Sequence, residues 1–203
     1  MCRMLIALGN LDLSPLFEGM KYMAQDKGKA TAHMIPNLTD KIVQDMFLTR
    51  GPEHKDGWGM AFLQEDKFII KKSQKAIFDD IQIEEVKNIK TNYVMLHTRF
   101  RSIGKNKLEN NAPFQNQGNV FCHNGTIRKG IKLNKNFKPL GNTDSEKFFL
   151  SILSKKKPME EAIKMSFDEL PLKANSNIIL SNKKNTYIYS SSRTLQNFFR
   201  MQI

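Results

Sequence analysis

Cys2 stands directly behind Met1, and this position could give its thiol a base of its own. If Met1 is removed, Cys2 carries both the thiol and a free α-amino group, whose ordinary pKa values are about 8.5 and about 7.7 to 8.0. The amine is then a base near neutral pH that can take the thiol proton directly or through one water. A small thiol in an N-terminal strand is more often a packing residue. Cys2 is therefore a candidate nucleophile that depends on support from other motifs.

Arg99 lies in the segment HTRFRSIG, which follows the apolar run YVML. An arginine at the end of a strand can bind a carboxylate through two parallel N–H···O bonds, a geometry that lysine does not offer. The alternative is a surface arginine that pairs with any nearby acid. This motif alone favours the alternative.

Asn124 and Gly125 end the apolar segment VFCHNG. Asn-Gly is the strongest short signal for a hairpin turn. The same turn could aim the side-chain amide of Asn124 and the backbone N–H of Gly125 at one point, which would make an oxyanion hole with two donors. The two interpretations are compatible, and the motif in isolation favours a simple turn.

Asp144 lies in the segment TDSE, which has the spacing of a capping box. In such a box the Thr143 side chain accepts from the N–H of Glu146, while the Glu146 side chain reaches back. Apolar residues follow at helical spacing: Phe148, Phe149, Ile152 and Leu153. Asp144 is either a carboxylate favoured by the helix dipole or a group that projects toward a substrate ammonium, and the sequence leaves both open.

The elements that must position these residues can be read from periodicity. β-prone runs predict strands at residues 2–8, 58–62, 67–72, 93–100, 119–123, 177–180 and 187–190. Helices are predicted at residues 14–25, 40–49, 143–154 and 159–170. Strands dominate the middle of the chain, where most candidate residues lie.

The length and composition are typical of a globular protein. The chain has 203 residues, of which 40% are hydrophobic and 26% charged. A chain of this size buries about 70% of the surface that it exposes when unfolded. No repeat, low-complexity tract or linker marks a second domain, so we expect residues 1–203 to form a single domain.

The apolar runs and the cysteine count indicate in which cell compartment the protein works. No apolar run approaches the roughly 20 residues that a membrane span needs, and MLIAL is too short for the core of a signal peptide. Only Cys2 and Cys122 are present, so a disulfide framework is not expected. We expect a cytoplasmic protein that does not contact the membrane.

The formal net charge of +12 raises the question of a nucleic-acid partner. The lysines, however, are scattered in short groups such as SKKK and NKK, without an arginine-rich tract or a helix-turn-helix, zinc-finger or RNA-recognition signature. A solvated basic surface is the favoured interpretation, and a nucleic-acid binder is the least favoured of the functional alternatives.

Taken together and in order, Cys2, HTR, HNG and NTDSE resemble the glutaminase domain of class II glutamine amidotransferases, which belong to the N-terminal nucleophile hydrolases. The segment DGWGMAF at residues 56–62 is similar to the stand-alone branch of that family. By motif, the resemblance runs from Cys2 to about Glu146. Each motif is weak evidence, and the ordered set is fairly specific.

The resemblance implies an α+β fold, a four-layer αββα sandwich of two antiparallel sheets between helical layers. It implies that Cys2 is the nucleophile and that Asn124 and Gly125 form the oxyanion hole. Arg99 would bind the α-carboxylate of glutamine, and Asp144 its α-ammonium group. Cys2 would then form a γ-glutamyl thioester and release ammonia, and water would release glutamate. Neither a metal nor an organic cofactor is implied.

Cys122, His97 and His123 are expected to support the site rather than take part in the chemistry. We place His97 and His123 with the substrate-binding residues, where we expect them to order the strand ends rather than bind a metal. Cys122 is expected to be a buried structural thiol, because it lies within a strand and lacks an α-amine. No paired spacing of Cys and His predicts a zinc site.

Several alternatives stay open. Many synthase-linked relatives have HTRWATHG where this chain has HTRFRSIG, so Phe100, Arg101 and Ile103 differ in a loop that commonly couples the site to an acceptor domain. We expect no synthase domain after the last strand, so ammonia would pass to a separate protein. The enzyme could instead cleave a γ-glutamyl amide other than glutamine. From another class, the chain could be a non-catalytic regulatory module with the same fold, which retention of Met1 would favour.

Overall fold

The computed structural model describes residues 2–38, 41–170, 176–191 and 201. Its strands are β1 (Arg3–Leu8), β2 (Trp58–Gln64), β3 (Lys67–Ser73), β4 (Tyr93–Thr98), β5 (Phe114–Asn116), β6 (Asn119–Gly125), β7 (Ser176–Ser181) and β8 (Thr186–Ser191). Its α-helices are α1 (Leu13–Ala24), α2 (Ala30–Met34), α3 (Lys41–Arg50), α4 (Ile83–Val86), α5 (Asp144–Ser154) and α6 (Met159–Asp168). Single 3-10 turns, η1 and η2, lie at Ile35–Asn37 and Leu108–Asn110.

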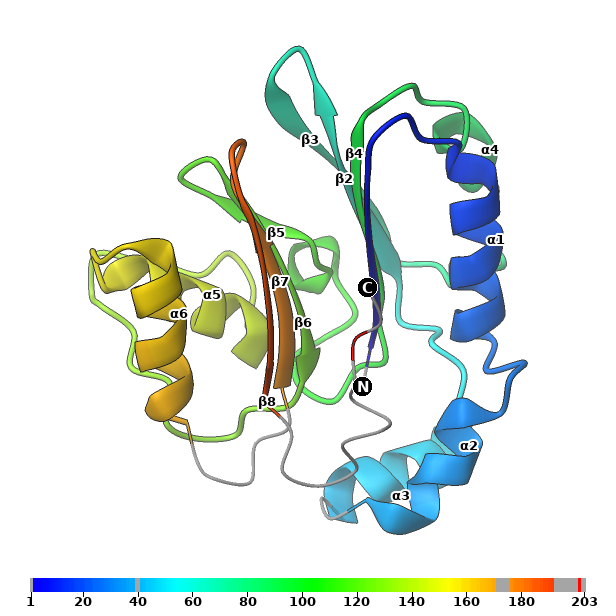
Figure 1. The fold of residues 1–203 in the computed structure, drawn as a ribbon. Coiled ribbons are helices and arrows are strands. Elements are labelled where there is room, and N and C mark those ends of the chain that lie inside the picture. The colour runs from blue at the N-terminus through cyan, green and yellow to red at the C-terminus, as the bar shows by residue number, and fades with distance from the viewer. Residues whose placement is uncertain (1, 39–40, 171–175, 192–200, 202–203) are drawn as a thin grey trace.

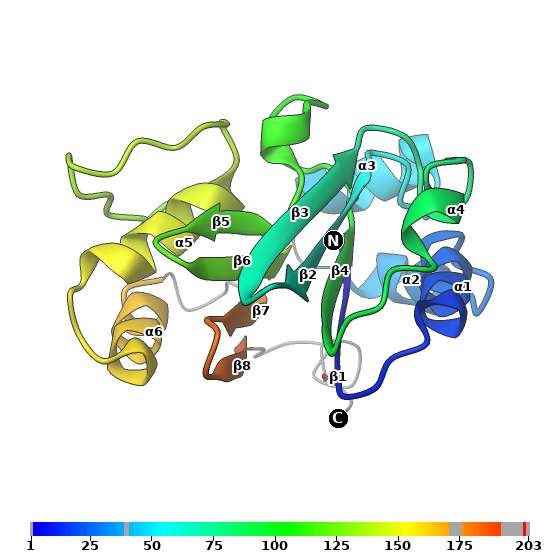
Figure 2. The ribbon, with the colours of Figure 1, turned by 90° about the horizontal axis from the view of Figure 1, so that it is seen from above.

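The strands form two four-stranded sheets that pack face to face. The first sheet has the order β1-β4-β2-β3 and the second has the order β5-β6-β7-β8. All the strand pairs in both sheets are antiparallel. Figure 1 shows α1 and α4 outside the first sheet and α5 and α6 outside the second, and Figure 2 shows the same layers from above. The predicted four-layer αββα sandwich is therefore confirmed.

Three apolar clusters hold these layers together. The largest lies between the sheets and under α5 and α6, and contains Phe121, Cys122 and Phe148. A second lies between the first sheet and α1, where the ring of Phe17 meets that of Trp58 edge to face. The third is small and joins α2, η1 and α3 to a single residue beyond β4, Phe100. The prediction that Cys122 is a buried thiol is confirmed, because Cys122 is 0% exposed.

Most predicted elements exist, with differences at their ends. The strand predicted at residues 93–100 ends at Thr98, because Phe100 turns away to join the third cluster. The short elements α2, α4 and β5 were not predicted, since each is too short to show a period. The predicted helix start at Asp40 lies outside the described residues. None of the described helices is long and apolar enough to cross a membrane.

The expected turn at Asn124-Gly125 is wrong. Both residues belong to β6, where Asn124 pairs with Asn177 and Gly125 with Ser176 of β7. Strand pairing with a segment far along the chain therefore overrides the local turn signal. The capping box is half right: Thr143 accepts from Glu146 N at 3.2 Å, but the Glu146 carboxylate accepts from the N–H groups of Leu140 and Gly141 instead of reaching back.

Candidate active site

Cys2 lies where β1, β4 and β6 come together between the sheets. Pairing of Arg3 with Thr98 sets the start of β1 beside the end of β4. The backbone nitrogen of Cys2 donates to Asn124 Oδ1 at 2.8 Å. The thiol donates to the carbonyl oxygen of Phe100 at 3.9 Å. The nucleophile predicted from sequence is thus buried and held by Asn124 of β6 and by the carbonyl of Phe100, two residues beyond β4.

Several groups act on the acidity of the Cys2 thiol. Burial raises the pKa of the thiol above its ordinary value, and the carboxylate of Asp144 acts in the same direction. The positive N-terminus, a backbone hydrogen bond at Phe100 and the cation of Arg99 act in the opposite direction, and burial outweighs them. Because the thiol stays protonated near neutral pH, its attack on a carbonyl requires a base within reach.

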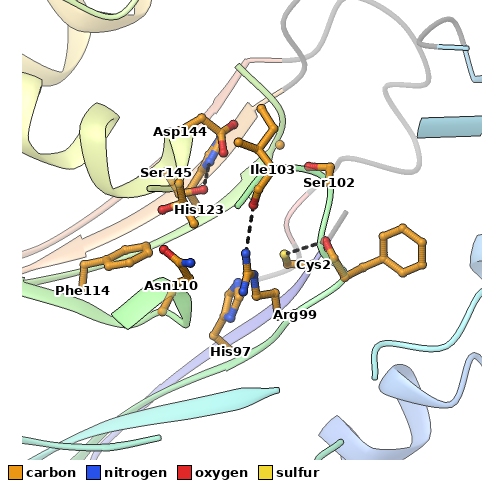
Figure 3. A pocket seen from close by; sticks show the side chains of 14 residues that line it. Cys2, His97, Arg99, Ser102, Ile103, Asn110, Phe114, His123, Asp144 and Ser145 are labelled. Carbon is orange, nitrogen blue, oxygen red and sulfur yellow. Dashed lines mark hydrogen bonds between the residues drawn. The ribbon is translucent and has the colours of Figure 1, made fainter. Parts of the chain in front are cut away.

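A small cavity opens beside Cys2, and residues from both sheets and from α5 line it. Figure 3 shows Arg99, His123 and Asp144 around this space, with Cys2 at its side. Gly125 lines it as well. Its volume of about 20 Å³ holds about one water molecule. The fold therefore brings most of the predicted site residues to one cavity, although that cavity is small.

Asn124 lies on the other side of Cys2. It lines a second, larger cavity of about 460 Å³ along β1, which Cys2 also borders. Because Asn124 Oδ1 accepts from Cys2 N, the amide nitrogen of Asn124 faces away from that bond. This nitrogen donates to no acceptor among the described residues. A side-chain N–H donor is therefore available next to the thiol.

Arg99 follows β4 as predicted, but it is not a surface residue. The residue is 4% exposed, and its guanidinium donates to Ile103 O at 2.9 Å, Lys105 O at 3.0 Å and Asn111 Oδ1 at 3.3 Å. No carboxylate in the described part of the chain lies within ion-pair distance of it. Arg99 is thus a buried cation that binds the carbonyls of its own loop, residues 102–107, instead of an anion from the described ranges.

Asp144 is the first residue of α5, and its carboxylate lies at the cavity. Its Oδ2 accepts from the backbone nitrogen of Ile127 at 2.6 Å, which ties the helix start to the segment after β6. Arg99 and Asp144 therefore bring one cation and one anion to the same cavity, with Cys2 at its side. This charge arrangement suits a zwitterion.

His123 and His97 lie deeper, at the wall of the cavity. His123 shares hydrogen bonds with Ser145 Oγ at 2.8 Å and Ser176 Oγ at 3.2 Å, and burial lowers its pKa to about 4. Burial and the charge of Arg99 lower the pKa of His97 to about 3, and its Nδ1 has no partner among the described residues. Both rings are therefore neutral near pH 7. Within the described ranges, no three His, Cys, Asp or Glu side chains gather as a metal site.

Other residues hold the site in ways that sequence reasoning missed. The hydroxyls of Ser102 and Thr126 share a hydrogen bond at 2.8 Å, which joins the 102–107 loop to the segment after β6. Asp56, in the segment DGWG, accepts from Arg101 N at 2.8 Å. Asn111 also donates to Ser73 O at 2.7 Å while it accepts from Arg99. These bonds join distant segments, so no local pattern signals them.

Curated proteins from two bacteria and an archaeon are similar to this chain. It is 31% identical to the Escherichia coli K12 protein named "Putative glutamine amidotransferase YafJ" over 160 residues, which cover 70% of this chain and 62% of that protein. It is 34% identical to a Haemophilus influenzae protein named "Putative glutamine amidotransferase" over 147 residues, which cover 64% and 50%. It is 32% identical to the uncharacterized protein MJ1515 of Methanocaldococcus jannaschii over 133 residues, which cover 61% of this chain and 37% of that protein. The chain thus spans about a third to three fifths of these relatives.

Solved structures show the same fold. Glutamine phosphoribosylpyrophosphate amidotransferase from Bacillus subtilis aligns with a TM-score of 0.60 and 17% identity, over 94% of this chain and 37% of that one. A Pseudomonas aeruginosa protein described as a predicted glutamine amidotransferase aligns with a TM-score of 0.52 and 26% identity, over 70% and 63%. The family model described as "Glutamine amidotransferases class-II" matches residues 38–202. Because this match covers most of the sequence, the chain belongs to the class II glutamine amidotransferases.

Proposed function

We propose that this chain hydrolyses the side-chain amide of glutamine through a thioester on Cys2, after removal of Met1. The observation that carries the proposal is the bond of 2.8 Å from Cys2 N to Asn124 Oδ1. Once Met1 is gone, this nitrogen is the α-amine of the nucleophile itself. The bond to Asn124 would orient the amine beside a buried thiol that needs a base.

The steps follow from these positions. The amine takes the thiol proton, and the sulfur attacks the δ-carbon of glutamine. The resulting oxyanion accepts from the Asn124 side-chain amide and the Gly125 N–H, a type of stabilisation that often supplies the largest part of catalysis. The carbon–nitrogen bond then breaks, and the protonated amine returns its proton to the leaving ammonia. Water attacks the γ-glutamyl thioester, glutamate leaves, and the thiol is regenerated.

Recognition of glutamine would use the two opposite charges of the cavity. Arg99 is a buried cation that forms no ion pair with a carboxylate among the described residues, which suits the α-carboxylate, and the carboxylate of Asp144 suits the α-ammonium group. His97 and His123, both neutral near pH 7, would line this end, and the bond of His123 to Ser145 Oγ would keep Ser145 in place. Since the cavity holds about one water molecule, the 102–107 loop would have to move before glutamine enters.

One observation favours a second candidate, a γ-glutamyl amide with a larger amine. The cavity of about 460 Å³ on the far side of Cys2 borders Asn124 and apolar residues of β1, β7 and β8. An amine larger than ammonia could leave into that space. We further propose that residues 1–203 act as one domain in the cytoplasm, where both cysteines stay free thiols, and that ammonia passes to a separate protein.

The deciding experiment combines intact mass with a glutamine analogue that carries a diazoketone. We expect the purified protein to lack Met1, to gain one label on Cys2, and to release ammonia and glutamate from glutamine. Cys2→Ala should gain no label and release nothing, while the matched variant Cys122→Ala should behave as the wild type. An active preparation that retains Met1 would overturn the mechanism. A folded, processed protein that hydrolyses only larger γ-glutamyl amides would favour the second candidate.

A further inference from the structure

The end of α3 packs against the residue that follows Arg99. The ring of Phe47 stacks on that of Phe100, with centroids 3.9 Å apart and planes inclined by 22°. Both rings are buried within the third apolar cluster, which α2, η1 and α3 otherwise supply. The side chain of Phe100 therefore packs with residues of α2, η1 and α3, and its ring also meets that of His54 edge to face.

Arg50, the last residue of α3, holds the backbone at the same place. Its guanidinium lies 4.9 Å from the ring centroid of Phe100 and donates to Arg101 O at 3.0 Å. It also donates to Asp56 Oδ2 at 2.5 Å, and this oxygen accepts from Arg101 N at 2.8 Å. Arg50 and Asp56 thus bind both backbone groups of Arg101, one directly and one through the carboxylate.

The backbone of Arg101, which Arg50 and Asp56 bind, directly follows the carbonyl group that the Cys2 thiol contacts. The carbonyl of Phe100, between Arg99 and Arg101, accepts from the thiol. On the other side of the thiol, the guanidinium of Arg3 donates to Thr31 Oγ1 in α2 at 2.5 Å. Thr31 of α2 and Arg50 of α3 therefore hold the chain on either side of the contact between thiol and carbonyl.

We propose that Arg50 is a positioning residue for the Cys2 thiol. It contacts the ring of Phe100, the backbone of Arg101 and the carboxylate of Asp56, and these contacts fix the Phe100 carbonyl that accepts from the thiol. Arg50 is not among the described residues that line the cavity, so it acts only through these neighbours. A displacement of about 1 Å in a reacting group can cost about 10²-fold in rate. The proposal rests on the proposed function only in taking Cys2 as the nucleophile.

The test is the rate of Cys2 alkylation by iodoacetamide as a function of pH, in a Cys122→Ala background. Arg50→Met keeps an apolar side chain beside Phe100 and removes every donor. We expect the pH midpoint of labelling to rise, because the backbone hydrogen bond at Phe100 is one of the groups that lower the pKa of the thiol. We also expect kcat for glutamine to fall by about tenfold to 100-fold with a smaller change in KM. Arg50→Lys, which keeps a cation, should recover part of both.

The controls separate this role from a purely structural one. Thr49→Ala lies on the same helix, is exposed, and removes a hydroxyl that bonds only within α3, so it should leave both readouts unchanged. Thermal unfolding reports whether each variant is folded, and Phe47→Leu replaces Arg50→Met if the latter does not fold. A folded Arg50→Met with the wild-type labelling midpoint and kcat would overturn the proposal. If the wild type hydrolyses no glutamine, the proposed function fails, while the labelling curve still decides on Arg50.

Discussion

The backbone nitrogen of Cys2 and the side-chain oxygen of Asn124 are 2.8 Å apart, although 122 positions separate them in the sequence. This bond joins the start of β1 in one sheet to the end of β6 in the other. Asn124 can therefore serve two purposes, because one end of its amide orients the future amine and the other end is left to donate to an oxyanion. The two roles can be separated by mutation.

Asn124→Asp keeps an oxygen for the amine but loses the N–H donor, whereas Asn124→Ala loses both. We expect each variant to lower kcat for glutamine by about 10² to 10³, the usual loss for one oxyanion donor, with little change in KM. Asn124→Ala should in addition shift the acidic limb of the pH–rate profile, because the amine acts as a base only when it is deprotonated and is no longer held. Steady-state kinetics across pH measure both effects. A variant with wild-type kcat would remove Asn124 from the site.

The resemblance to a known family predicted the sandwich, whereas local signals in the sequence predicted its larger helices and strands. The helix at α5 follows from its Thr143 cap and apolar spacing, and the long strands follow from their apolar runs. The turn at Asn124-Gly125 was predicted wrongly because the residues that pair with it in β7 lie some fifty positions further along. Likewise, Asn111 accepts from Arg99 and Asp56 accepts from the backbone nitrogen of Arg101, and the sequence indicated neither of these contacts between loops.

Arg99 should determine affinity more than turnover. Arg99→Lys keeps a positive charge but cannot present two parallel donors to a carboxylate. Hydrogen bonds to charged groups contribute about 1.5 to 3 kcal/mol, so we expect KM for glutamine to rise by about tenfold or more. Arg101→Lys is the matched control, because Arg101 directly precedes the same loop but its side chain is 37% exposed. Its Nε lies 3.7 Å from Asp56 Oδ1, so this arginine already pairs with a protein carboxylate. An unchanged KM in Arg99→Lys would show that its only role is to hold the 102–107 loop.

The neutral histidines should make the fold sensitive to acid. The pKa of His97 is about 3 and that of His123 about 4, against about 6.5 in an unfolded chain. Below about pH 6.5 the unfolded state therefore binds protons that the folded state does not, so the free energy of unfolding falls as the pH falls toward 4. This contribution is fully present above about pH 6.5.

Urea unfolding at pH 7.5 and pH 4.5 tests this account of the histidines. His123→Gln keeps hydrogen-bonding groups beside Ser145 and Ser176 but cannot titrate, so its loss of stability between the two pH values should be smaller than that of the wild type by about 2 kcal/mol. His33→Gln is the control, because His33 is exposed. An equal loss in His123→Gln and the wild type would show that burial of this ring does not contribute.

The hydrogen bond between Ser102 and Thr126 should slow access to Cys2. These hydroxyls join the 102–107 loop to the segment after β6 across a cavity that holds about one water molecule. Removal of one such bond costs about 1 kcal/mol, which raises the population of an open loop by about fivefold. Ser102→Ala should therefore speed alkylation of Cys2 by about fivefold, measured by mass at a fixed pH.

Ser154→Ala is the control, because the hydroxyl of Ser154 bonds only within α5, and it should leave the alkylation rate unchanged. Because the contacts of the Cys2 thiol are the same in Ser102→Ala, the pH midpoint of labelling should not change. A Ser102→Ala variant that labels at the wild-type rate would place the barrier to entry elsewhere, in the three bonds that hold Arg99 to its loop and to Asn111.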